Sequence, residues 1–293
     1  GMSSKNYVAL AVNVANNASI SLLEIQDDYK TVAMPYFEQK ADEYAIFNSL
    51  SYLSTHSHLA GATESGAVVI ADLETAEDII HRTVDSAGAR AVRYTKSGLL
   101  ATLGQSNAGQ LLLWDRRAPP TGSGVEVACH QRPLVNNSRG QALADKDSYL
   151  TCLEAHPSNE FEFYCGTSTG TIVMWDIRKT DASVDGVVVE LERSQHTSGQ
   201  AVTALAFKDE SRSPYLLSGA ADGSITCVNY HEKLHNSSTI FKQMGVNSSG
   251  LGSNGGEVDL GFDQGTSAVK SIQSHPATQE ILVTSKLGEV KLL

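Results

Sequence analysis

The segment Gly166–Gly170 reads "GTSTG" and matches G-x-S-x-G, the spacing with which serine hydrolases present a nucleophile. Ser168 would be that nucleophile. A nucleophile elbow needs a strand before the serine and a helix after it. The residues that follow, "TIVMWDIR", are β-branched and apolar, so they predict a strand instead. We therefore interpret Ser168 as a turn residue between two strands.

Two other residue pairs have spacings that could do chemistry. His56 and His58 would face one side of a strand, as metal ligands do, but no cysteine or carboxylate cluster nearby completes a site. We expect both to be solvated loop histidines. The acidic pairs Asp27-Asp28 and Asp42-Glu43 are interpreted as loop residues, because no apolar sequence surrounds them that would raise the pKa of a general acid.

A glycine-rich motif, "GLGSNG" at Gly250–Gly255, matches G-x-G-x-x-G. It lies in a Ser/Asn/Gly stretch with no preceding strand and no following helix, so it is interpreted as a flexible loop and not as a dinucleotide site. The sequence thus predicts no catalytic residue, no metal site, no cofactor and no small-molecule substrate. The expected protein is not an enzyme.

The elements that carry these residues belong to an internal repeat. Residues 89–117 and 150–178 both run apolar strand, polar turn, apolar strand, glycine-ended tight turn and apolar strand, and end in Trp114-Asp115 and Trp175-Asp176 followed by x-Arg. The same plan fits 46–73, 201–230 and 268–293, with a weaker copy at 7–25.

Each repeat is predicted to contain a two-strand connection whose glycine takes positive φ. These turn glycines are Gly66, Gly109, Gly170, Gly223 and Gly288. Further β-like runs lie between the repeats, at 29–37, 125–134 and 184–192, which makes about four short antiparallel strands per unit. Residues 75–84 could equally form a helix, but a strand fits the repeat better.

The predicted fold is all-β, a β-propeller in which sheets stack radially. Six blades can be counted, and a seventh is compatible with the sequence. We expect a single domain over residues 2–293 with insertions at about 118–147 and 231–266. The formal net charge of −11 argues against direct nucleic-acid binding, and no apolar stretch is long enough for membrane insertion. Cysteines are scattered and suit buried, reduced thiols.

The Trp-Asp pairs that close glycine-turn strands resemble the WD40 repeat family. That family uses a His, a Ser/Thr, a turn Asp and the strand Trp as a buried hydrogen-bonded tetrad. His196, Ser218 and Asp222 match three of these positions in one repeat, where Val228 replaces the Trp. The resemblance implies that packing, more than polar networks, holds most blades together.

Residues 91–117, 149–179 and 269–284 resemble, in order and spacing, the WD-repeat nucleoporin of the 43-kilodalton class. This resemblance implies a structural protein of the outer-ring Y-complex of the nuclear pore, with roles in protein and mRNA transport. Its partner would be an α-helical solenoid nucleoporin of the same complex. The implied location is the nuclear pore complex at the nuclear envelope and, by the same resemblance, the kinetochore.

An alternative function starts from Arg117 and Arg178. Both complete a WDxR motif, whose arginine helps substrate receptors of cullin-type ubiquitin ligases to engage the ligase adaptor. An arginine after a Trp-Asp strand also commonly caps a loop or pairs with a carboxylate of the neighbouring blade. The two arginines are therefore candidate partner contacts, with the structural role preferred.

Overall fold

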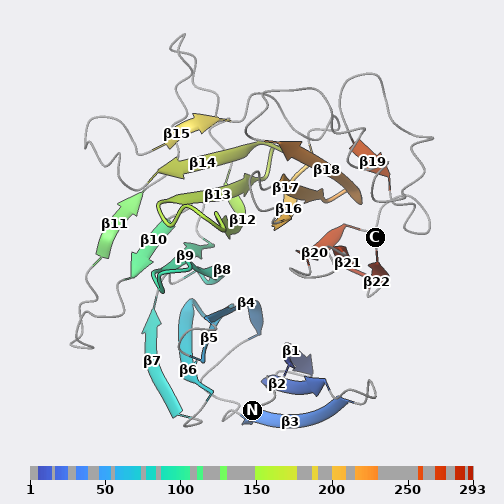
Figure 1. The fold of residues 1–293 in the computed structure, drawn as a ribbon. Helices are drawn as coiled ribbons and strands as arrows, with labels where there is room; N and C mark the ends of the chain where they lie inside the picture. The colour runs from blue at the N-terminus through green and yellow to red at the C-terminus, as the bar shows by residue number, and fades with distance from the viewer. Residues whose placement is uncertain are drawn as a thin grey trace. The chain divides into compact units, whose positions relative to one another are not determined.

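A computed structural model of the chain gives the arrangement of its strands (Figure 1). The structure describes the backbone of 6–14, 17–25, 31–38, 46–53, 57–73, 77–83, 87–105, 111–114, 126–130, 149–176, 187–190, 200–208, 215–229, 257–259, 268–274, 281–287 and 290–292. It describes side chains in 46–53, 57–73, 87–105, 111–114, 149–175, 200–208, 215–226, 268–274 and 281–287.

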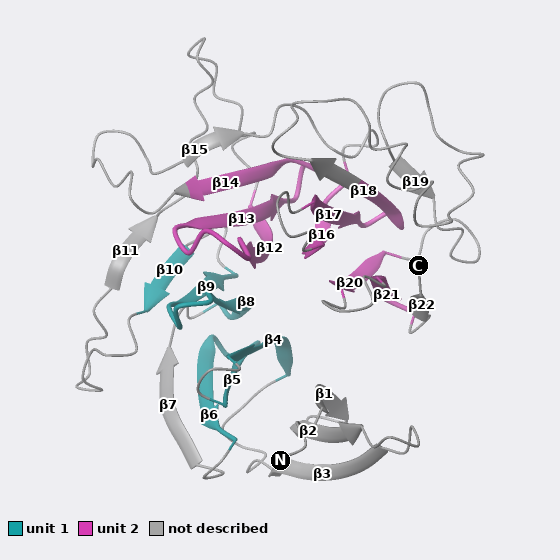
Figure 2. Cartoon of the chain, viewed as in Figure 1, with its two compact units in different colours: residues 1–129 teal, residues 130–293 magenta. Residues whose placement is uncertain are grey.

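The described residues form strands and turns, with no helix among them, as the sequence predicts. Two compact units divide the chain, residues 1–129 and 130–293 (Figure 2). The first unit contains β1 (Asn6–Val14), β2 (Asn17–Ile25), β3 (Thr31–Glu38), β4 (Phe47–Leu53), β5 (His58–Thr63), β6 (Ala67–Asp72), β7 (Glu77–Thr83), β8 (Ala89–Tyr94), β9 (Leu100–Gly104) and β10 (Leu111–Trp114), with β11 (Glu126–His130) at the boundary.

The second unit continues the same pattern. It contains β12 (Leu150–Ala155), β13 (Glu162–Thr167), β14 (Ile172–Asp176), β15 (Val187–Glu190), β16 (Val202–Lys208), β17 (Tyr215–Ala220), β18 (Ser224–Asn229), β19 (Glu257–Asp259), β20 (Val269–Ser274), β21 (Ile281–Ser285) and β22 (Val290–Leu292).

Every sheet is an antiparallel meander in which strands that follow each other in the chain are neighbours. The described strands form four-stranded sheets β4–β7, β8–β11, β12–β15 and β16–β19, and three-stranded sheets β1–β3 and β20–β22. The three β-like runs between repeats became β3, β11 and β15, and residues 77–83 are a strand, so both predictions are confirmed. The insertion at 231–266 contributes β19, which the sequence did not predict.

Glycine supplies the backbone conformation that the tight turns need. Gly66 between β5 and β6, Gly170 between β13 and β14, and Gly223 between β17 and β18 have φ of 88°, 84° and 87°. An L side chain is strained in that region, whereas glycine has no Cβ to clash. Gly109 and Gly288 lie outside the described residues, so their turns stay predictions.

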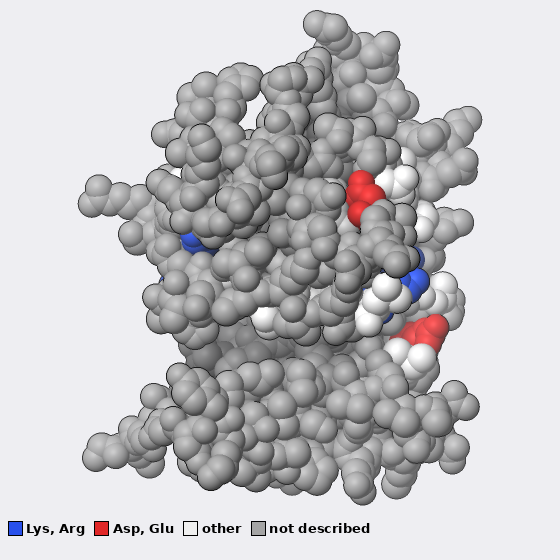
Figure 3. All heavy atoms as spheres, turned by 90° about the vertical axis from the view of Figure 1, so that its right-hand side faces the viewer, with Lys and Arg blue, Asp and Glu red and all other residues white. Residues whose placement is uncertain are grey.

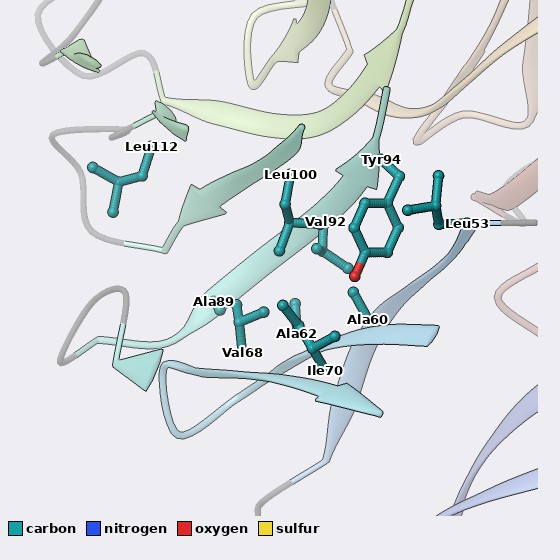
Figure 4. Packing of buried hydrophobic residues seen from close by; sticks show 10 residues of the cluster. All are labelled: Leu53, Ala60, Ala62, Val68, Ile70, Ala89, Val92, Tyr94, Leu100 and Leu112. Atoms are coloured by element: carbon teal, nitrogen blue, oxygen red, sulfur yellow. The ribbon is translucent and has the colours of Figure 1, made fainter. Parts of the chain in front are cut away.

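In the first unit, the β4–β7 and β8–β11 sheets pack against each other through small and branched apolar side chains. Figure 4 shows this cluster, with the ring of Tyr94 beside Leu53. The cluster consists of Leu53, Ala60, Ala62, Val68, Ile70, Ala89, Val92, Tyr94, Leu100 and Leu112. Successive residues of β5, β6 and β9 are buried on both faces, so these strands show no strict alternation of apolar and polar residues.

In the second unit, glycines let neighbouring sheets approach closely. A Cβ added at Gly166 would lie 2.7 Å from Val202 Cβ, and one added at Gly219 would lie 2.5 Å from Val269 Cγ1. Val202 and Val269 are the first residues of β16 and β20. The β12–β15 and β16–β19 sheets therefore each pack the first strand of the next sheet directly over a glycine.

The fold is thus all-β and built from small antiparallel sheets that pack face to face within each unit, as a β-propeller requires. Blade number and the single-domain organisation over 2–293 stay predictions. None of the described residues forms a helix long and apolar enough to span a bilayer.

Candidate functional site

Ser168 lies in the turn between β13 and β14, and a strand follows it. Its Oγ accepts the backbone N–H of Tyr149 at 3.1 Å, and its own N–H donates to the Tyr149 carbonyl at 2.9 Å. Ser168 therefore ties the turn to the residue that precedes β12. The strand–helix geometry of a nucleophile elbow is not present at Ser168, which agrees with its interpretation as a turn residue.

A different position of the repeat, in the middle of the second strand of the sheet, carries a polar side chain that faces the third strand in three sheets. Trp114 at the end of β10 donates from Nε1 to Thr102 Oγ1 on β9 at 2.8 Å. Thr102 is buried and faces Leu112, two residues before the tryptophan. This is the hydroxyl–indole pair of the tetrad that the resemblance implied, in a repeat where sequence comparison did not find it. The signal was the hydroxyl residue in the middle of the second strand.

In the next sheet, Cys165 occupies the hydroxyl position. It faces Val173, two residues before Trp175, and Trp175 is 1% exposed. Burial raises the pKa of the Cys165 thiol far above its usual range, nearby Cys152 raises it further, and the neighbouring Trp175 side chain opposes the rise. Both cysteines are buried and free, as expected for reduced thiols. Cys165 is therefore a neutral packing residue and a poor nucleophile.

A third variant of the pair appears where Val228 replaces the tryptophan. Ser218 faces Thr226, and the two hydroxyls are 2.5 Å apart in a buried position. Asp222 in the adjoining turn accepts both the N–H and the hydroxyl of Ser224, at 3.0 and 2.6 Å. The hydroxyl that would have met an indole is thus satisfied by a second hydroxyl. His196 lies outside the described residues.

Side-chain hydrogen bonds link the first strands of neighbouring sheets, and we call this contact the clasp. Asn48 Nδ2 donates to the Ala89 carbonyl at 2.9 Å in the first unit. In the second unit, Thr151 Oγ1 donates to the Val202 carbonyl, and Thr203 Oγ1 donates to the Val269 carbonyl at 2.6 Å. Each acceptor is the first residue of the next sheet's first strand.

The donors of this clasp share one structural origin, a bulge at the second residue of the strand. The strand register skips Asn48, Thr151 and Thr203. A bulge leaves one residue outside the ladder and re-aims its side chain. Arg90 and Lys270 are skipped in the same way on β8 and β20. The clasp was not predicted, because its acceptor belongs to another sheet.

The histidine interpretation was wrong for His58. It is the first residue of β5, is buried and faces Asp72 across the ladder with β6. His56, the acidic pairs and the 250–255 loop lie outside the described residues. In the part of the chain whose side chains are described, no three His, Cys, Asp or Glu residues gather so that they could hold a metal ion.

Several predicted repeat residues are placed only in part. Trp114 and Trp175 sit at or near the ends of β10 and β14, and the backbone of Asp176 ends β14. Asp115 and the candidate contacts Arg117 and Arg178 lie outside the described residues, so their roles stay predictions.

The described surface offers single apolar side chains and scattered charges. The most exposed large apolar residue is Leu287, at 75%, and Ile46, Tyr52 and Leu282 are also exposed. On the face shown in Figure 3, the described acidic and basic side chains are dispersed and do not form one patch of a single sign.

Comparison with known proteins supports the fold. No family model matches the chain, and no curated protein matches its sequence. Among solved structures, a chain of the crystal structure of the mitotic checkpoint complex matches with a TM-score of 0.62 and 17% identity, over 98% of this chain and 70% of that chain. At this identity the likeness concerns the fold alone. It supports a WD40-like β-propeller architecture for the chain.

Proposed function

We propose that the protein is a non-catalytic scaffold that binds other proteins. The observation that carries this proposal is the use of its polar side chains. Ser168, which stands in the nucleophile-like motif, hydrogen-bonds within a turn. The Thr102–Trp114 and Ser218–Thr226 pairs are hydrogen-bonded between strands of the same sheet. A fold whose chemistry-bearing groups serve its own architecture offers faces and turns for partners instead.

The finer proposal is a structural nucleoporin of the outer-ring Y-complex, located at the nuclear pore. It rests on the resemblance of residues 91–117, 149–179 and 269–284 to that class, and the propeller fold is compatible with it. The proposed partner is an α-helical solenoid nucleoporin. The mitotic checkpoint complex contains a chain with a similar fold, and this likeness names neither an assembly nor a partner for this chain.

The second candidate function is substrate receptor of a cullin ubiquitin ligase. The observation in its favour is that Arg117 and Arg178 each follow a strand tryptophan by three residues, in two consecutive repeats. In a receptor, these guanidinium groups would contact an adaptor. In a nucleoporin, they would satisfy loop carbonyls or a neighbouring carboxylate.

The double variant Arg117→Glu/Arg178→Glu separates the two functions. The wild type and the double variant are each tagged and purified from the native source, and their partners are identified and compared. Their melting temperatures are measured as a control for folding. We expect helical nucleoporins with both versions and a signal at the nuclear rim. Loss of a cullin adaptor on mutation, with an unchanged melting temperature, would favour the receptor, because a desolvated charge-assisted contact contributes about 2–5 kcal/mol.

A further inference from the structure

The turn between β12 and β13 is held by a histidine ring. His156 Nδ1 accepts the backbone N–H groups of Ser158 at 3.1 Å and Asn159 at 2.9 Å. An imidazole nitrogen can accept only when it carries no proton, so the ring must be the neutral form with its proton on Nε2. In the cation both nitrogens are donors, and neither backbone N–H would have its acceptor.

The rest of the turn is built on these two bonds. Asn159 Oδ1 accepts the Phe161 N–H at 3.2 Å, and Asn159 Nδ2 donates to Glu162 Oε1 at 2.6 Å. The backbone N–H of His156 closes the turn by donating to the backbone carbonyl of Glu162 at 3.0 Å. Displacing Asn159 therefore disturbs the whole turn and not one contact.

The same ring also joins two sheets. Its centroid lies 5.1 Å from that of Phe207 on β16 and 6.2 Å from that of Tyr164 on β13. Tyr164 and Phe207 are themselves in edge contact at 5.2 Å. A change in the position of the His156 ring would therefore alter the packing between the β12–β15 and β16–β19 sheets.

We propose that His156 is a proton-sensitive latch, whose protonation opens the turn 156–161 and loosens the aromatic contact between these two sheets. The folded turn uses the neutral ring. Its stabilisation is therefore present while the ring is neutral, and it is lost as the pH falls and the ring takes up a proton.

Other titratable groups stand on the elements around the ring. They are Glu154 on β12, Glu160 in the turn, Glu162 and Tyr164 on β13, and Lys208 beside Phe207 on β16. The Glu162 carboxylate is already bound by Asn159 and by the Tyr164 hydroxyl, at 2.6 and 3.0 Å. The carboxylates of these glutamates attract an imidazolium cation. The cation can form only when Nδ1 no longer accepts the two backbone N–H groups, so protonation of the ring opens the turn.

Hydrogen exchange of the full chain tests the latch. Exchange at the Ser158 and Asn159 amides is measured at pH 7.5 and pH 5.5 and corrected for the intrinsic effect of pH. In the wild type we expect opening to increase about ten-fold at the lower pH, because an ordinary imidazole released in the open turn takes up one proton over this range and that uptake favours opening. Exchange that does not change between the two pH values would overturn the proposal.

Variants distinguish the proton from other effects of pH. His156→Asn keeps an acceptor that does not titrate, so its turn amides should be equally protected at both pH values, whereas His156→Ala should be open at both. The same pH response in His156→Asn as in the wild type would refute the latch. Independently of any variant, ¹⁵N shifts of the wild-type ring at pH 7.5 should show an unprotonated Nδ1, and a protonated Nδ1 would refute it.

Discussion

The close approach of β20 to Gly219 leads to a quantitative prediction for Gly219→Ala. The new Cβ would lie 2.5 Å from Val269 Cγ1, 2.7 Å from Val269 Cβ and 3.1 Å from Ile272 Cδ1. Carbon atoms pack best at about 3.5–4.0 Å, so the Val269 side chain and the new Cβ must move apart by roughly 1 Å. Val269 cannot provide it by rotating, because its Cβ is one of the clashing atoms and β-branched side chains are stiff.

The expected loss of stability follows from two opposing terms. Overpacking a core costs about 1–3 kcal/mol, and replacing glycine by alanine returns about 0.4–1 kcal/mol by restricting the unfolded chain. We expect a net destabilisation of about 1–2 kcal/mol, measured by equilibrium denaturation with urea. A Gly219→Ala protein as stable as the wild type would refute the packing described for the β16–β19 and β20–β22 sheets.

A double-mutant cycle assigns the effect to Val269. Val269→Gly removes both clashing atoms and is strongly destabilising alone, because it empties a buried site. Combined with Gly219→Ala, it should cost less than the sum of the two single changes by at least about 1 kcal/mol, because residues in contact couple. Strictly additive effects would mean that the two residues do not touch.

The remaining predictions concern a turn, a core side chain and a thiol. Gly170→Val should lower the free energy of unfolding by about 1–3 kcal/mol in a thermal melt, because valine is strained at a φ of 84°, and an unchanged melt would contradict the turn. Trp175→Ala should lower it by about 3–5 kcal/mol, and a loss below 1 kcal/mol would show that the indole is not packed in the core. Because its pKa is raised, Cys165 should resist iodoacetamide at pH 8.5 in the folded protein and react after denaturation, as peptide mapping would show, whereas labelling of the folded protein would contradict its burial.

The strands were predictable because the information for them is local. Glycine before an apolar run, as at Gly66, Gly170 and Gly223, marks a tight turn, and β-branched residues on either side mark the strands. Even the ambiguous segment 75–84 could be assigned by its place in the repeat, and it contains the strand β7. Ser168 was removed from consideration as a nucleophile by the same local reasoning.

The contacts between sheets were not predictable, because they depend on residues distant in sequence. Nothing near Thr151 or Thr203 indicates that the hydroxyl will meet a carbonyl of the following sheet, 51 or 66 residues later. His58 resembled a loop histidine because its burial is produced by neighbouring strands. The strand β19 escaped prediction because it is only three residues long within a Ser/Asn/Gly-rich insertion.

Quantitative affinity purification of the tagged full chain from its native source asks whether this propeller serves as a scaffold in a protein assembly. We expect α-helical solenoid nucleoporins to be recovered in amounts comparable to the tagged chain and to remain bound during washing at high salt. Recovery of the chain without any protein in comparable amount would refute the scaffold role, and recovery of a cullin adaptor in place of the nucleoporins would refute the nucleoporin proposal.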